Sequence, residues 1–223
     1  MSRFRGSAVF LAAATLILLV APRARATGMY GEPSPGEPEF GFSLGYANVD
    51  LGSGSTVNNE GAFRFDWGFS IAPIGVLPQI RVGADVGTSL VLDNSTRTII
   101  SHNGTLIVAG SSSVPLWFIE PELCLSWRQT FGARKEIFVE PGIAGGWTVG
   151  FLDIHDINDL NRSYHADAST AYGRVFLRAG AGVPTAMIGV EASYLVGGNM
   201  DFGGNASGDI QEYYLGFFGA IRF

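Results

Sequence analysis

Apolar and polar side chains alternate along eight segments of the chain, from residue 40 to its last residue. An alternation with a period of two predicts β-strands, because successive side chains of a strand point to opposite faces. In the clearest segment Phe63, Phe65 and Trp67 lie on one face, and Arg64 and Asp66 lie on the other. The eight predicted strands are 40–47, 62–71, 79–90, 116–127, 137–151, 172–183, 187–196 and 212–223.

The two faces of these segments differ in charge. One face carries no charged residue and holds most of the tryptophans, whereas the other carries twelve charges: Arg64, Asp66, Arg81, Asp85, Glu120, Glu122, Glu140, Arg174, Arg178, Glu191, Glu212 and Arg222. The interior of an eight-stranded barrel is too narrow for so many large apolar side chains. The charged face should therefore line the lumen and the apolar face should meet lipid.

The lumen charges should pair, because an unpaired buried charge is costly. Two interpretations remain for the paired network. The favoured one is a static set of ion pairs that plugs the barrel, and the alternative is a gate or a narrow conduit for ions or small molecules. Pro121 and Pro141 each remove one donor from the strand ladder and predict a bulge or a local distortion.

The connections alternate in length, as they do in outer-membrane barrels. The segments 48–61, 91–115, 152–171 and 197–211 are long, and 72–78, 128–136 and 184–186 are short. The fold class predicted is all-β, a single eight-stranded antiparallel up-and-down transmembrane β-barrel with both termini in the periplasm. Asn103-Gly104 lies between two strand-forming runs and predicts a projecting hairpin. A barrel of ten strands is the alternative interpretation of those two runs.

The N-terminal residues indicate export. Arg3 and Arg5 precede an uncharged apolar run, and Ala24-Arg25-Ala26 follows it as a cleavage site, so 1–26 is predicted to be a signal peptide. An uncleaved membrane anchor is the alternative. Residues 27–38 are rich in proline and glycine and predict a flexible segment. The barrel domain is then 39–223.

Composition narrows the possible partners. Removing the four arginines of the predicted signal peptide leaves 10 basic and 20 acidic residues, a formal charge of −10. Such a charge argues against nucleic acid as a partner. Cys124 is the only cysteine, so no internal disulfide forms, and no zinc-ligand spacing occurs. No cofactor and no metal are therefore predicted.

Other candidate chemistry lies in the predicted outer loops. His102, His155 and His165 fall there with neighbouring acids, but no nucleophile motif accompanies them, so no catalytic residue is assigned. A lipid-modifying activity of His155 or His165 remains the enzymatic alternative. Four aspartates, Asp153, Asp156, Asp159 and Asp167, make the third loop acidic without matching the spacing of an EF-hand calcium loop.

Two stretches carry a resemblance to a known family. The last strand alternates Tyr213, Leu215, Phe217, Gly219, Ile221 and Phe223, and 137–147 is a proline- and glycine-rich strand. Both resemble the OmpA-like and opacity-type outer-membrane barrels of Gram-negative bacteria. The resemblance implies that Tyr213, Leu215, Phe217, Ile221 and Phe223 form an assembly signal for the barrel-insertion machinery.

The resemblance also implies the setting and the role of the chain. The expected location is the outer membrane, with its lipid and lipopolysaccharide as partners. The expected role is structural, or contact with an unknown extracellular ligand through the outer loops, without enzymatic activity.

Overall fold

The computed structural model describes most of the chain after residue 35. The described residues are 36–52, 55, 57, 60–74, 76–77, 79–91, 98–102, 105–109, 116–155, 163–183, 185–203 and 206–223. The predicted signal peptide and most of 27–38 lie outside them. No helix among the described residues is long and apolar enough to cross a membrane.

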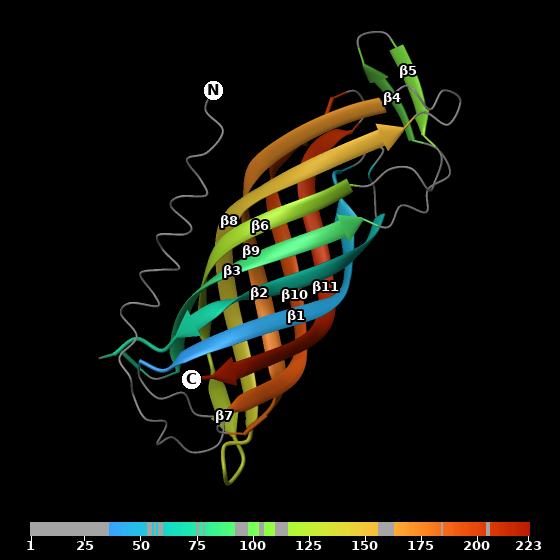
Figure 1. Cartoon of the computed structure of the whole chain (residues 1–223). Helices are drawn as coiled ribbons and strands as arrows, with labels where there is room; N and C mark the ends of the chain where they lie inside the picture. Colours follow the sequence, from blue (N-terminus) through green and yellow to red (C-terminus); the bar gives the residue numbers. More distant parts are fainter. Residues whose placement is uncertain are drawn as a thin grey trace.

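Eight strands wrap around a common axis (Figure 1). They are β1 (Pro38–Asp50), β2 (Glu60–Ile71), β3 (Ile80–Val91), β6 (Leu116–Trp127), β8 (Ile137–His155), β9 (Ser163–Val183), β10 (Ala186–Asp201) and β11 (Ser207–Arg222). Each pairs antiparallel with the next in this order, and β1 pairs with β11 over Glu39–Asp50. The sheet therefore closes on itself, which confirms the eight-stranded up-and-down barrel.

Two further strands stand apart from the barrel. They are β4 (Thr98–His102) and β5 (Thr105–Ala109), which form a separate two-stranded sheet with Ile100 opposite Ile107. Figure 1 shows this hairpin beyond one end of the barrel. The predicted hairpin is confirmed and the ten-stranded alternative is wrong, while its Asn103-Gly104 turn lies outside the described residues. We call the end that carries β4 and β5 the outer end, and the opposite end the inner end.

The strands at the outer end are longer than the alternation predicted. β8 runs on to His155 and β9 begins at Ser163, so the predicted loop 152–171 shortens to 156–162. Likewise β10 and β11 occupy much of the predicted loop 197–211. The reason is that the outward face of these extensions carries exposed polar residues such as His165, Asp167 and Ser169 in place of the apolar ones that mark a lipid-facing strand.

The two strand prolines interrupt the pairing between β6 and β8 without shifting its register. β6 and β8 keep a single register from Leu116 opposite Leu152 to Ser126 opposite Gly142, but no pairing occurs at Pro121. The pairing is lost again beside Pro141 and resumes in β7 (Gln129–Phe131), which continues β6 in the same register. Of the two predicted outcomes, the local distortion is confirmed and the bulge is not found, because a missing donor breaks single bonds without inserting a residue. The one register shift along the described pairs lies in β10, between Val196 and Asn199.

Burial is inverted relative to a water-soluble protein. Large apolar side chains point outward, with Phe217 77% and Ile188 73% exposed, while Arg64 and Glu191 are 0% exposed inside. The residues of the predicted assembly signal, Tyr213, Leu215, Phe217, Ile221 and Phe223, are all exposed on the outer surface. The sequence therefore assigned the two faces of the barrel correctly.

The lumen is closed by an apolar lid at the outer end. Leu51, just beyond β1, and Phe202, just beyond β10, are buried there with Phe118 and other apolar side chains of the strands. The hydroxyl of Tyr164 donates a hydrogen bond to the carbonyl oxygen of Phe202. Burial and the nearby Asp201 carboxylate raise the pKa of Tyr164, which keeps this hydroxyl protonated and able to donate. A smaller apolar cluster, with Phe138 and Phe218, lies in the inner part of the lumen.

Candidate functional site: the charge network of the lumen

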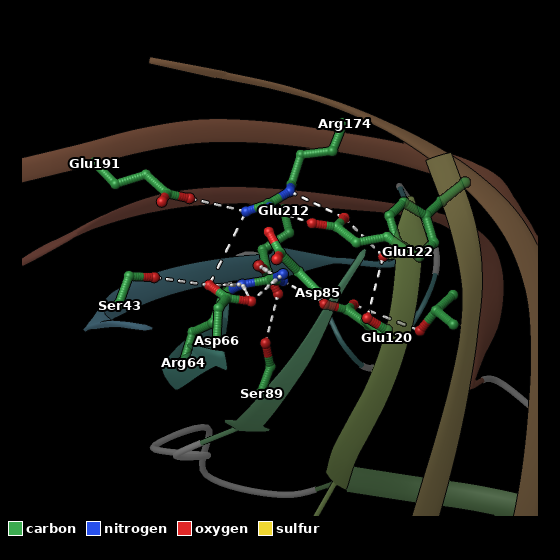
Figure 2. A network of polar contacts seen from close by, with 12 residues as sticks. Ser43, Arg64, Asp66, Asp85, Ser89, Glu120, Glu122, Arg174, Glu191 and Glu212 are labelled. Carbon is green, nitrogen blue, oxygen red and sulfur yellow. Dashed lines mark hydrogen bonds and ion pairs between the residues drawn. The ribbon is translucent and has the colours of Figure 1, made fainter. Parts of the chain in front are cut away.

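All twelve charged residues predicted for the lumen lie inside the barrel, and each is at most 9% exposed. Their strands place them there because every second residue of a barrel strand points inward. Figure 2 shows the outer part of this network, where charged side chains from six strands converge. The network divides into an outer group and an inner group by its contacts.

Arg64 holds three carboxylates in the outer group. Its Nε and Nη2 donate to Asp66, at 3.0 and 2.7 Å, and its Nη1 donates to both Glu120 and Glu212. Neighbouring hydroxyls complete two of these carboxylates, since Ser43 donates to Asp66 at 3.0 Å and Ser89 donates to Glu212 at 2.9 Å. A single guanidinium therefore serves three acids from three strands (Figure 2).

Arg174 and Arg178 hold the other acids of the outer group. Arg174 donates to both oxygens of Glu122 and, through Nη1, to Glu191 at 2.9 Å. Arg178 donates to the second oxygen of Glu191 at 2.7 Å and lies 3.5 Å from Asp85. The ring of Phe176 lies beneath both guanidiniums, at 5.3 and 4.7 Å from its centroid, a distance typical of cation–π contacts.

The inner group surrounds a carboxylate that the sequence analysis did not select. Glu39 accepts two bonds of 2.8 Å from Arg128 and lies 3.5 Å from Arg81 and 3.3 Å from Arg222. Arg128 also donates to Glu140 at 2.5 Å, and Arg178 lies 3.9 Å from Glu140, which connects the two groups.

Glu39 and Arg128 were missed because the strand boundaries were drawn one residue too short. Glu39 precedes Phe40, and Arg128 follows Trp127. Extending each alternation by one residue puts both side chains on the lumen face. The signal that could have found them is a charged residue at the next inward position of each alternation.

The two groups differ in charge balance. The outer group has three arginines and six carboxylates, whereas the inner group has three arginines and two carboxylates: Arg64, Arg174 and Arg178 with Asp66, Asp85, Glu120, Glu122, Glu191 and Glu212, and Arg81, Arg128 and Arg222 with Glu39 and Glu140. The formal excess of negative charge therefore lies in the outer group. It sits directly beneath the apolar lid.

Glycines in the wall make room for these side chains. A Cβ atom at Gly68 would lie 2.0 Å from an oxygen of Asp85, and one at Gly87 would lie 2.5 Å from both Arg64 and Asp66. The space that remains is small. One cavity of about 10 Å³ adjoins Glu39, Asp85 and Arg178, which is room for about one water molecule.

The described residues offer little for catalysis or for metals. No group of three or more acids, histidines or cysteines among them is arranged to hold a metal ion. The three histidines lie in strands and not in loops as predicted: His102 in β4, His155 at the end of β8 and His165 in β9. His165 Nδ1 lies 2.9 Å from Asp153 across the strand pair. Asp156 and Asp159 lie outside the described residues.

Comparison with known proteins shows the fold. No protein-family model matches the chain, and no curated protein does. The crystal structure of neisserial surface protein A is 7% identical, with a TM-score of 0.55 over 83% of this chain and 97% of that one. A major outer membrane protein of Thermus thermophilus is 11% identical, with a TM-score of 0.53 over 84% and 98%. At such low identity the likeness establishes a shared barrel fold alone.

Proposed function

We propose that this chain is an outer-membrane β-barrel protein with a closed lumen and a structural or surface-interaction role. The observation that carries the proposal is the inverted burial. Phe217 is 77% exposed on the outer surface, whereas Arg64 is 0% exposed inside. This arrangement suits a barrel wall that faces hydrocarbon. The likeness to the neisserial and Thermus barrels supports the same location, and the predicted signal peptide 1–26 would provide export.

Aromatic side chains near the two ends of the wall support a membrane setting. Trp117 stacks on Phe151 and Tyr194 on Tyr213 toward the outer end, with ring centroids 4.3 and 4.6 Å apart. Trp127 is exposed toward the inner end. Such girdles lie at the two interfaces of a bilayer. The outer girdle would contact lipopolysaccharide, and the exposed face of β11 would be the signal read by the insertion machinery.

The closed lumen favours this role over a conduit. The buried cluster around Phe202 and the paired arginines occupy the lumen, and the cavity beside Glu39, Asp85 and Arg178 has room for about one water. The parts available to an extracellular partner are the hairpin β4–β5 and the ribbon formed by the outer ends of β8 and β9. We propose that these two segments bind the ligand of the protein, and that the protein is not an enzyme.

The test begins with deletion of residues 98–109. These residues make no strand pairs with the barrel, so the variant should fold and keep the heat-modifiable migration of a closed barrel on gels. Binding of the variant to host cells or matrix should fall if the hairpin is the contact site. Binding at the unchanged level, with the barrel folded, would assign the contact to another segment or remove the adhesive role.

Single-channel recording separates the plugged barrel from the conduit. Refolded protein in a planar bilayer should give no discrete current steps, with a boiled sample as the control. Steps from folded protein alone would refute the closed lumen. An enzymatic role would be indicated if His165→Ala, compared with the matched surface variant Ser169→Ala, abolished a change in lipid A acylation seen by mass spectrometry.

A further inference from the structure

The six carboxylates of the outer group are not equally well bonded. Both oxygens of Glu122 and both oxygens of Glu191 accept bonds from arginines, and Asp66 and Glu212 each combine an arginine with a serine hydroxyl. Asp85 has only Arg178 at 3.5 Å but adjoins the water-sized cavity. Four of these acids therefore have at least two bonding partners, and Asp85 has a cation and a cavity beside it.

Glu120 is the exception. Its Oε2 accepts one N–H bond of the Arg64 Nη1, whose other N–H bond goes to Glu212, so the two negative charges lie on either side of one nitrogen. Its Oε1 has only the hydroxyl of Thr148, at 3.5 Å, which is the outer limit of a hydrogen bond. The side chain is 0% exposed and does not line the cavity. Among the described residues, the hydrogen bonds of this carboxyl group are those to Arg64 and Thr148.

The charged and titratable neighbours of Glu120 come from four strands. β2 supplies Arg64 and Asp66, β6 supplies Glu122, β9 supplies Tyr172 and Arg174, and β11 supplies Glu212. From β8 only the hydroxyl of Thr148 faces it, and from β3 its direct partner is Gly87. Arg174 donates to Glu122 and Glu191 and lies 4.0 Å from Asp66, so Arg64 is the one guanidinium that the structure pairs with Glu120 or Glu212 among the described residues.

We propose that Glu120 holds a bound proton in the folded barrel, and that this proton keeps the outer group of the network closed. A neutral carboxyl removes the repulsion between Glu120 and Glu212 and cancels one of the three excess negative charges. Its Oε1–H can donate to the Thr148 hydroxyl, which then accepts rather than donates. The barrel would in this way be a pH-sensitive plug, since loss of the proton adds a second negative charge beside Glu212 on the Nη1 of Arg64, in a buried group that already has excess negative charge.

The sign of the pH dependence follows from proton counting. Glutamate in the unfolded chain is ionised at neutral pH. The folded barrel then binds one more proton than the unfolded chain, so stability falls as the pH rises. One such proton changes the unfolding equilibrium constant by about tenfold per pH unit at most.

The experiment compares Glu120→Gln with Glu122→Gln in urea titrations between pH 6 and 9, followed by tryptophan fluorescence in lipid vesicles. Glutamine resembles the protonated acid, so Glu120→Gln should fold, equal the unsubstituted protein at pH 6 and lose its slope with pH. Glu122→Gln removes a carboxylate that Arg174 binds at both oxygens, and should lower stability at every pH without changing the slope.

An infrared titration of the unsubstituted protein provides an independent readout should either variant fail to fold. A protonated carboxyl band should persist at pH 7 and disappear as the pH rises. Absence of this band at pH 7 would overturn the proposal. So would a Glu120→Gln variant that is destabilised to the same extent as Glu122→Gln at every pH.

Discussion

Arg174 is the residue whose removal should damage the barrel most clearly. Replacement by methionine keeps the length of the aliphatic stem but removes three charge-assisted hydrogen bonds, two to Glu122 and one to Glu191. Each such bond contributes about 1.5–3 kcal/mol. Part of the loss is offset, because Tyr172 still donates to Glu122 at 2.9 Å and Arg178 still donates to Glu191 at 2.7 Å.

The expected net cost of Arg174→Met is about 3–5 kcal/mol, the range for breaking a buried ion pair by removing one partner. The loss comes from stranding a carboxylate. The double variant Arg174→Met/Glu122→Gln, which removes that charge as well, should therefore recover at least about 1 kcal/mol of the loss. The exposed Arg134 serves as the matched control, and Arg134→Met should stay within about 0.5 kcal/mol of the unsubstituted protein.

The assay is the free energy of unfolding in urea, followed by the fluorescence of the four tryptophans in lipid vesicles. Heat-modifiable migration on gels confirms that each variant closes. A cost below about 1 kcal/mol for Arg174→Met would refute the argument, because it would mean that water reaches the stranded carboxylates. A double variant less stable than the single one would refute it equally, by showing that Glu122 supports the barrel without its arginine.

Two further changes test the wall itself. Gly68→Ala would place a Cβ 2.0 Å from Asp85 and 2.4 Å from a backbone oxygen, and should cost about 1–3 kcal/mol in urea titrations, whereas Gly173→Ala, with nothing within 4 Å, should be neutral. Val190→Arg, at a half-exposed position of the outer surface, should cost about 2–4 kcal/mol in lipid, and Val190→Leu less than about 1.5 kcal/mol. Equal losses of stability for the two glycine variants would contradict the crowding of the lumen at Gly68. Equal losses for the two Val190 variants would contradict the lipid-facing position of this residue.

The sequence by itself determined the order of the eight barrel strands and their two faces, whereas the structure excluded the ten-stranded alternative. A period of two fixes which residues share a face, and an eight-stranded barrel has too narrow a lumen for the large apolar face. Segment 62–71 illustrates this, because its alternation alone separated Trp67 from Arg64. The separate hairpin could also be predicted, because its two runs are short and Asn103-Gly104 lies between them.

Only the tertiary structure decided how the charges meet and where the strands end. Arg64 contacts Glu212, 148 positions later in the chain, because barrel closure pairs both β2 and β11 with β1, so that both side chains point into the same part of the lumen. The same closure gives Glu120 no arginine of its own and places Phe202 over the lumen. Alternation reports the side of the wall on which a residue lies. It holds no information about the partner across the lumen, which depends on the geometry of all eight strands together.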